Sequence, residues 1–287
     1  MAKQTAEQVT EGVDLTGKTA LVTGVNSGIG LETMRVLAAR GARVFGTART
    51  EAKAAAASAE VSGDTVPLAC ELTDPDSINA CIAAVADTPL DIIVANAGIM
   101  ALPTLELCRG VEMQFATNHL GHFQLLTSLT ENMSAAGDCR VAVVSSAAHL
   151  QAPKEGIEFD NLDGSRGYSG FRAYGQSKLA NVLFANELNR RTPAQVKVNS
   201  LHPGIIQTNL GRHMKGPFAM ILGLFMFPFM STVPQGAATS CFLAASPEAA
   251  GFSGEYFTNC RPAKTNPLAN DEALARRLWE VSAGLIG

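Results

Sequence analysis

The sequence predicts a single α/β domain in which a doubly wound parallel sheet carries helices on both faces. Short apolar runs, often β-branched, alternate with segments of helical periodicity along the whole chain. Such alternation is typical of parallel strands joined by right-handed crossovers. The composition is 47% hydrophobic and only 17% charged, which suits a sheet that is buried on both faces. No internal repeat or linker divides the 287 residues.

The expected strands are short apolar runs bounded by glycine or polar turn residues. They lie at 18–23, 42–47, 65–72, 91–98, 139–146, 195–204 and 254–258. The first of them leads into a glycine-rich turn, and the fourth leads into a turn of small residues. Because ligands of open α/β sheets bind beyond the carboxyl ends of the strands, we expect the binding site at these turns.

The expected helices have apolar residues at helical spacing and recognisable boundary residues. They lie at 29–40, 51–61, 75–86, 109–136, 172–191, 235–246 and 270–285. Gly41 ends the first helix, whereas Asp74 can cap the third, with Pro75 at its first position. The polar, glycine-rich stretch 147–171 is expected to be loop, and 211–233 is an irregular apolar segment.

Charge and hydropathy argue against several classes of protein. The net charge of −4 and the lack of a Lys/Arg run argue against a nucleic-acid partner. The polar N-terminal residues do not resemble a signal peptide, so a cytoplasmic protein is expected. The longest apolar stretch, 216–230, is shorter than the ~20 residues that a membrane span needs. Gly223 and Pro228 also interrupt it.

The cysteines and histidines do not follow the pattern of a disulfide framework or a metal site. The six cysteines include no Cys-x-x-Cys pair and no metal-type histidine spacing. We therefore expect reduced, mostly buried thiols. His119 and His122 share a face of an expected helix with no third ligand nearby, so we expect packing or surface roles and no metal.

The turn TGVNSGIG at 23–30 places its glycines between an expected strand and helix, as a dinucleotide-binding loop does. Gly24 permits the tight turn, Gly28 lets the backbone approach a pyrophosphate, and Gly30 lets the helix pack close to the sheet. The start of the helix then offers free N–H groups to the phosphates. The residues expected to contact the cofactor here are Gly24, Asn26, Ser27, Gly28, Ile29 and Gly30.

The stretch YGQSK places Tyr174 and Lys178 four residues apart in an expected helix. A free phenol has a pKa of about 10, and a nearby ammonium favours the phenolate and lowers that pKa. Such a pair could move a proton on and off an alcohol oxygen. On its own the spacing is more often that of a helix-surface contact.

The spacing G-x-x-x-G-x-G, with YGQSK far downstream, resembles the short-chain dehydrogenase/reductase family over roughly residues 15–284. The chain looks most like the retinol-dehydrogenase-like branch through SKLANVLFANEL, LHPGIIQTNLGRH, SGEYF and ARRLWEVS. The resemblance implies one Rossmann-type domain over 1–287, with 1–14 as an N-terminal extension. It also implies a homodimer or homotetramer, in line with the apolar composition.

The resemblance assigns further residues to the cofactor and to catalysis. Asn96, Ala97 and Gly98 match a family motif that lines the floor of the cofactor site, although Ala95 replaces its first asparagine. The residues that match the segment holding the nicotinamide carboxamide are Pro203, Gly204, Ile206 and Thr208. The expected catalytic residues are Asn118, Ser146, Tyr174 and Lys178.

The end of the second expected strand bears on the choice between NAD and NADP. NAD enzymes have an acidic residue here that accepts from the ribose 2′-OH, whereas this chain has Ala48 followed by Arg49. An arginine with no carboxylate beside it suits a 2′-phosphate, and Ser27 could add a hydroxyl contact. We therefore predict NADP(H). Glu71 and Leu72 stand where the family has Asp followed by Leu or Val, which leaves the adenine contact open.

The roles that the resemblance implies are those of a proton-transfer site. Tyr174 is the expected general acid in reduction and general base in oxidation. Lys178 is expected to lower the pKa of that phenol and to bind the nicotinamide ribose. Ser146 is expected to hydrogen-bond the substrate oxygen, and Asn118 to hold a water that relays protons to solvent.

Two segments are expected to border the substrate. The loop 147–171 matches the branch, and Tyr168 within it lacks a lysine four residues on, so we expect an ordinary loop residue. The segment 209–233 contains four Phe and four Met, which suits a lid over a bulky hydrophobic substrate. An oligomer interface and a weak membrane contact through 216–230 are open alternatives, and these roles can overlap.

The sequence thus predicts an NADP(H)-dependent oxidoreductase that interconverts a hydrophobic alcohol and its aldehyde or ketone. The alternative from another class is a non-catalytic NADP(H)-binding regulator on the same fold, since a fold alone does not define an activity. A regulator has no need of the complete set Asn118, Ser146, Tyr174 and Lys178, which favours the enzyme. No residue of the sequence specifically indicates an epimerase or a light-driven reductase on this fold.

Overall fold

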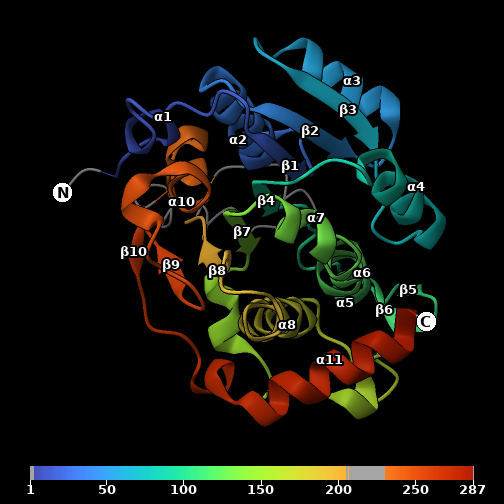
Figure 1. Ribbon diagram of the computed structural model, residues 1–287. Coiled ribbons are helices and arrows are strands. Elements are labelled where there is room, and N and C mark those ends of the chain that lie inside the picture. The colour runs from blue at the N-terminus through green and yellow to red at the C-terminus, as the bar shows by residue number, and fades with distance from the viewer. Residues whose placement is uncertain (1–2, 205, 207–229, 287) are drawn as a thin grey trace.

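The structure, a computed structural model, describes residues 3–204, 206 and 230–286. Its centre is an eight-stranded sheet in the order β10-β9-β8-β7-β4-β1-β2-β3, with helices on both faces (Figure 1). The strands are β1 Thr19–Thr23, β2 Arg43–Ala48, β3 Thr65–Ala69, β4 Ile92–Ala95, β7 Cys139–Val144, β8 Val196–His202, β9 Tyr256–Thr258 and β10 Arg261–Pro262. The pairs from β3 to β9 are parallel and β9 with β10 is antiparallel. The predicted doubly wound α/β fold is confirmed, with a short antiparallel edge.

The helices form two layers that each bury an apolar face against the sheet. The longer ones are α2 Gly28–Ala39, α3 Glu51–Ala59, α4 Pro75–Val85, α6 Gly121–Ser128, α8 Gly170–Arg191, α10 Val233–Ala245 and α11 Glu272–Ile286. Residues of α4, α6 and α8 share one core cluster. Residues of α2, α3 and α10 share another cluster on the opposite face of the sheet. Each layer keeps water from one face, as a parallel sheet requires.

Most predicted elements are confirmed, including one boundary that was argued from specific residues. The Asp74 side chain accepts from Asp76 N at 3.0 Å, and Pro75 occupies the first turn of α4. The loop predicted at 147–171 contains 3₁₀ turns at Ala147–Gln151 and Phe159–Asn161 and gives way to α8 at Gly170.

The single helix predicted at 109–136 is wrong. Arg109 and Gly110 have positive φ values of 51° and 77°, and they turn a small hairpin of β5 Leu107–Cys108 with β6 Val111–Glu112. The rest of that stretch is divided among α5 Met113–Phe115, a π-helical segment Ala116–Leu120, α6 and α7 Thr130–Ala135. The Glu112 carboxylate begins the helical run by accepting from Phe115 N at 2.9 Å, so helical periodicity alone placed the start too early.

The predicted N-terminal extension 1–14 contains α1 Ala6–Val9, whose Thr5 and Gln8 form a capping box. Ala6 is buried in a small cluster with Val36 of α2 and with Ala237 and Cys241 of α10. The extension therefore packs on the domain. Residues 209–229 of the predicted lid, and with them nearly all of 216–230, lie outside the described residues. No described helix is long and apolar enough to cross a membrane.

Candidate active site

The glycine turn after β1 leaves room only for backbone. Gly24 has φ 74°, and a Cβ on it would lie 2.9 Å from Ala97 Cα. A Cβ on Gly30 would lie 2.2 Å from Gly24 O, and Gly28 has φ 61°. Because glycine adopts positive φ without strain and allows these close approaches, the turn and the start of α2 have the form that fits a dinucleotide pyrophosphate.

The turn after β4 is fastened to the end of β1. Asn96 donates through Nδ2 to Thr23 O at 2.9 Å, and its backbone N–H donates to Thr23 Oγ1 at 2.9 Å. Ala97 N also donates to Thr23 Oγ1, at 3.0 Å. His122 Nε2 lies 2.9 Å from the same hydroxyl. This network places the Asn96–Gly98 turn beside the glycine turn, as the sequence predicted.

Asn118 lies in the π-helical segment, and its side chain joins the turn after β4 to α8. Its Oδ1 accepts from Ile99 N at 2.8 Å, and its Nδ2 donates to Ile99 O at 3.0 Å and to Ser177 Oγ at 2.9 Å. A Cβ on Gly98 would lie 3.0 Å from Asn118 Oδ1 and 3.5 Å from Lys178 Nζ. Since π-helical turns frequently occur at functional sites, the local helix geometry is consistent with a site here.

Ser146 and Tyr174 meet between the end of β7 and the second turn of α8. Tyr174 is 6% exposed, and the Ser146 side chain lies close enough to its phenol to lower the pKa that burial raises. Ser146 also caps the following 3₁₀ turn, where its Oγ accepts from Ala148 N at 3.2 Å. The two predicted catalytic hydroxyls therefore lie close together, that of Tyr174 buried and that of Ser146 half-buried.

Lys178 reaches the same point from one helical turn further along α8. Its side chain is buried, and Nζ donates to Val144 O at 3.1 Å. The Nζ atom lies 5.8 Å from the centroid of the Tyr174 ring. Burial lowers the pKa of this ammonium to about 8, because a charged group loses hydration in the interior.

The pKa of the Tyr174 phenol is shifted in the direction opposite to the one expected from the sequence. The Lys178 ammonium was expected to lower it, whereas burial raises it and the nearby Ser146 side chain opposes the rise. The reason is geometric: the ammonium is directed to the Val144 carbonyl rather than to the phenol oxygen. The tyrosine of the protein alone is thus a protonated acid at neutral pH.

The expectation that Arg49 has no carboxylate beside it is wrong. Arg49 Nε lies 3.6 Å from Glu71 Oε2, with the two side chains 53% and 28% exposed. Glu71 Oε1 is held in turn by Thr73, through its N–H at 3.3 Å and its hydroxyl at 3.0 Å. The partner carboxylate comes from the end of β3, on the neighbouring strand, so sequence distance concealed it. Leu72 beside it is buried.

The segment predicted to hold the nicotinamide is described only in part. Gly204 has φ 96°, and a Cβ on it would lie 3.2 Å from Ser231 Oγ. Ile206 pairs with Ser231 in an isolated bridge, and Pro203 follows β8 directly. Thr208 lies outside the described residues.

The histidines predicted to have packing roles do pack in the interior. His119 and His122 are fully buried, and His119 Nε2 lies 2.8 Å from Ser282 Oγ. Burial lowers the pKa of His119 to about 3 and that of His122 to about 4. All six cysteines are free thiols, four of them buried. Over the described part of the chain, no three His, Cys, Asp or Glu side chains gather as a metal site would require.

Sequence reasoning missed His149, which lies three residues after Ser146 and contacts it. Its Nδ1 lies 2.7 Å from Ser146 O, and its Nε2 receives Asn266 N–H at 3.2 Å. The signal available in the sequence was the position itself, one 3₁₀ turn beyond an expected catalytic serine. Tyr168 is a loop residue, as predicted, and donates to Leu102 O at 2.8 Å.

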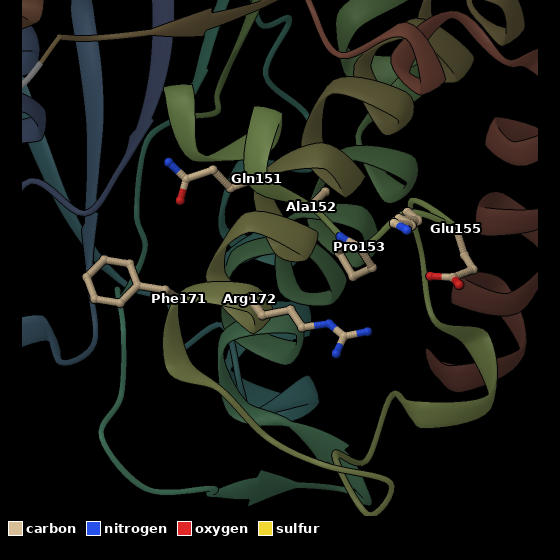
Figure 2. A pocket seen from close by; sticks show the side chains of 7 residues that line it. Gln151, Ala152, Pro153, Glu155, Phe171 and Arg172 are labelled. Carbon is tan, nitrogen blue, oxygen red and sulfur yellow. The ribbon is translucent and has the colours of Figure 1, made fainter.

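An open hollow of about 460 Å³ lies beside the start of α8. It is lined by Gln151, Ala152, Pro153, Lys154, Glu155, Phe171 and Arg172. In Figure 2, Phe171 and Gln151 project to the same side of the ribbon. The Phe171 ring is 51% exposed only three residues before Tyr174, so an apolar surface adjoins the tyrosine.

Three comparisons with known proteins agree with this geometry. Residues 18–159 match the family model of short chain dehydrogenases. The chain is 40% identical to short-chain dehydrogenase TIC 32 B, chloroplastic, of Brassica napus, over 98% of this chain and 92% of that protein. It is 38% identical to human retinol dehydrogenase 14, over 94% and 86% respectively. A crystal structure of a Mycobacterium paratuberculosis protein superposes with TM-score 0.78 at 30% identity, covering 99% of this chain and 98% of that one.

The chain therefore belongs to the short-chain dehydrogenase/reductase family. Within that family it lies in the retinol-dehydrogenase-like branch. It is an oxidoreductase of CH–OH groups that uses a nicotinamide dinucleotide, and the glycine cradle described above fits that cofactor.

Proposed function

We propose that the protein is an NADP(H)-dependent oxidoreductase that interconverts a hydrophobic alcohol and its aldehyde or ketone. The observation that carries the proposal is the approach of the half-buried Ser146 side chain to the buried Tyr174 phenol, with Lys178 one turn away. When bound, NADP(H) supplies or accepts the hydride. The chain's own residues then have to hold the substrate oxygen and move one proton.

Tyr174 is the proton donor in the proposed reduction. Burial raises the pKa of its phenol, so the hydroxyl carries its proton at neutral pH and can give it to the substrate oxygen. Ser146 contributes a second hydroxyl at the same point and stabilises charge developing on that oxygen. Lys178 lies behind the tyrosine as the cation that stabilises the phenolate left after transfer.

The preference for NADP(H) rests on Arg49 at the end of β2. Its guanidinium is more than half exposed, so it can turn from Glu71 to a 2′-phosphate, which offers a full charge and several acceptors. Arg49→Glu should weaken NADPH binding about tenfold or more and change NADH binding by less than about twofold. Arg43→Glu is the matched control, since Arg43 is an exposed arginine at the other end of the same strand. Equal losses of affinity for NADPH and NADH would show that Arg49 does not recognise the 2′-phosphate.

The proposed substrate class rests on apolar surface around the site and on a relative. Leu150 and Phe171 are 57% and 51% exposed on segments adjoining Ser146 and Tyr174, and 209–233 is rich in Phe and Met. One relative is named a retinol dehydrogenase. Loss of reduced-nicotinamide absorbance on adding hydrophobic aldehydes and ketones, but not short polar ones, tests the class. Tight NADPH binding without turnover on a broad panel would favour the non-catalytic regulator.

We also propose that the protein is a cytoplasmic homodimer or homotetramer. The apolar composition supports the assembly. Sedimentation analysis of the purified protein would measure the mass, and a monomer would contradict the assembly. Retention on anionic vesicles would instead favour a membrane contact through 216–230.

A further inference from the structure

His149 is buried at the centre of the 3₁₀ turn Ala147–Gln151 that follows Ser146. Two donors of this residue converge on the Ser146 carbonyl: the backbone N–H of His149 at 3.1 Å and ring Nδ1 at 2.7 Å. The other ring nitrogen, Nε2, faces the backbone N–H of Asn266 at 3.2 Å. Asn266 Nδ2 returns a bond to His149 O at 3.2 Å.

These partners define the protonation of the ring. A carbonyl oxygen only accepts hydrogen bonds, so Nδ1 must carry the proton, and a backbone N–H only donates, so Nε2 must be bare. The ring is therefore the neutral Nδ1–H tautomer with both nitrogens in use. Burial, which lowers the pKa of His149, keeps it in that form.

The ring thereby joins the serine to two distant parts of the chain. Asn266 caps the short turn Pro267–Asn270 that precedes α11, accepting from Leu268 N at 3.0 Å. The His149 ring also packs on Tyr256 of β9, with centroids 4.8 Å apart. A displacement of the ring would therefore move the serine relative to the C-terminal part of the domain.

The same turn determines how closely the tyrosine helix can approach. A Cβ on Gly175 would lie 2.8 Å from Ala148 O, so α8 packs on the backbone of this turn directly beside Tyr174. The distance between the Ser146 and Tyr174 hydroxyls consequently depends on where the turn Ala147–Gln151 sits. His149 is the residue of that turn whose side chain anchors it on both sides.

We propose that His149 is a positioning residue for the catalytic pair. Its Nδ1–H fixes the Ser146 carbonyl and its Nε2 fixes the turn against Asn266, which together hold the Ser146 hydroxyl at the Tyr174 phenol. This role rests on the function proposed above, because it acts through Ser146. It predicts that the donor side of the ring matters more to the chemistry than the acceptor side.

Two amide substitutions separate the two sides of the ring. The side-chain amide of His149→Asn can replace the Nδ1–H donor to Ser146 O, whereas that of His149→Gln reaches toward Asn266 and lacks that donor. We expect His149→Gln to lower kcat between about tenfold and a hundredfold, as small misplacements of reacting groups do. His149→Asn should retain most of kcat. For both variants the NADPH Kd and the substrate KM should stay within about twofold, because Ser146 acts chiefly on the charge that develops on the substrate oxygen during transfer.

A spectroscopic readout makes the test independent of turnover. The chain has three tyrosines, so protein labelled with ¹³Cζ-tyrosine gives three signals, and Tyr174→Phe identifies the one from Tyr174. We expect His149→Gln to shift this signal, because the position of the Ser146 side chain next to the phenol is altered, and His149→Asn to leave it in place. Asn266→Ala is the control for general loosening of the C-terminal segment.

The outcomes distinguish the two proposals. An unshifted Tyr174 signal and unchanged kcat in folded His149→Gln would overturn the positioning role. A fall in kcat that follows the melting temperature equally in His149→Gln, His149→Asn and Asn266→Ala would also overturn it, as a purely structural effect. If the wild type turns over no carbonyl, the proposed function fails, while the shift of the Tyr174 signal still decides whether His149 sets the Ser146–Tyr174 contact.

Discussion

The two ends of the proposed cofactor site are built in opposite ways. At the chemical end, Tyr174 and Lys178 are buried next to the half-buried Ser146. Asn118 is fully buried, with its amide bonded to protein atoms on two sides. At the adenine end, Arg49 and Glu71 form an ion pair across 3.6 Å with the arginine 53% exposed. One end is fixed before any ligand arrives, and the other is held by an interaction that water can replace.

The difference follows from burial. Hydrogen bonds and charges in the interior are electrostatically stronger and costly to leave unpaired, so the geometry of the chemical end is set by folding. An exposed ion pair contributes only about 0.2–1 kcal/mol, so exchanging it for a ligand costs little. This contrast suits an enzyme whose chemistry is constant while the recognition of the cofactor can be tuned.

The largest expected effect is that of Lys178→Met at the chemical end. The substitution removes the buried ammonium and leaves the Val144 carbonyl without that donor. We expect kcat to fall by on the order of 10²-fold or more, as for loss of an acid–base group, and NADPH binding to weaken about tenfold. Stopped-flow hydride transfer and a fluorescence titration measure the two effects. A variant with wild-type kcat and an unchanged melting temperature would show that this end is not what limits catalysis.

An effect of intermediate size is expected on folding stability at acidic pH, because the neutral side chains of His119 and His122 are buried near the chemical end. The folded pKa values of His119 and His122 are lowered by burial to about 3 and about 4 from the ordinary 6.5. The unfolded chain therefore binds more protons, and stability that is fully present above pH 6.5 is lost as the pH falls toward 4. The slope approaches about 1.4 kcal/mol per pH unit for each histidine.

Urea unfolding at several pH values measures this slope. His119→Gln removes one titrating group, and its dependence between pH 6.5 and 4 should be flatter than that of the wild type. Parallel curves for the two proteins would show that His119 is not held neutral by the fold.

The smallest expected effect is that of Glu71→Gln at the adenine end. Removing the carboxylate frees Arg49 for a 2′-phosphate, so NADPH should bind more tightly by up to about fivefold, the equivalent of an exposed ion pair. NADH should bind as before, and the gain should shrink at high salt. Asp64→Asn, which removes the partner of Arg43, is the matched control. A gain of the same size for both cofactors would mean that Glu71 does not compete with the phosphate.

How far the sequence could predict these two ends follows from what each depends on. The strand ends, the glycine turn and the Tyr174–Lys178 spacing are local features, and periodicity with turn chemistry was sufficient to locate them. The π-helical segment at Asn118 could not be predicted in this way, because its residue pattern does not differ from that of an α-helix. The hairpin at Leu107–Glu112 depends on positive φ at Arg109, which is uncommon outside glycine.

Contacts across the fold were beyond sequence reasoning. The carboxylate beside Arg49 comes from the next strand, and Asn266 reaches His149 from a segment 117 residues away. The pKa of Tyr174 depends on how deeply its ring is buried and where the Lys178 ammonium is directed, which are properties of packing. Such pairings become visible only once the strands are placed side by side.

The central claim is that the buried hydroxyl of Tyr174 carries the chemistry while contributing little to cofactor recognition. The most direct measurement is single-turnover oxidation of saturating NADPH by a carbonyl substrate in wild type and Tyr174→Phe, with the NADPH Kd of each. Tyr168→Phe, at the loop tyrosine, is the control. We predict a fall in the transfer rate of about 10²-fold or more with the Kd unchanged within about twofold. A Tyr174→Phe protein that transfers hydride at the wild-type rate would contradict the account.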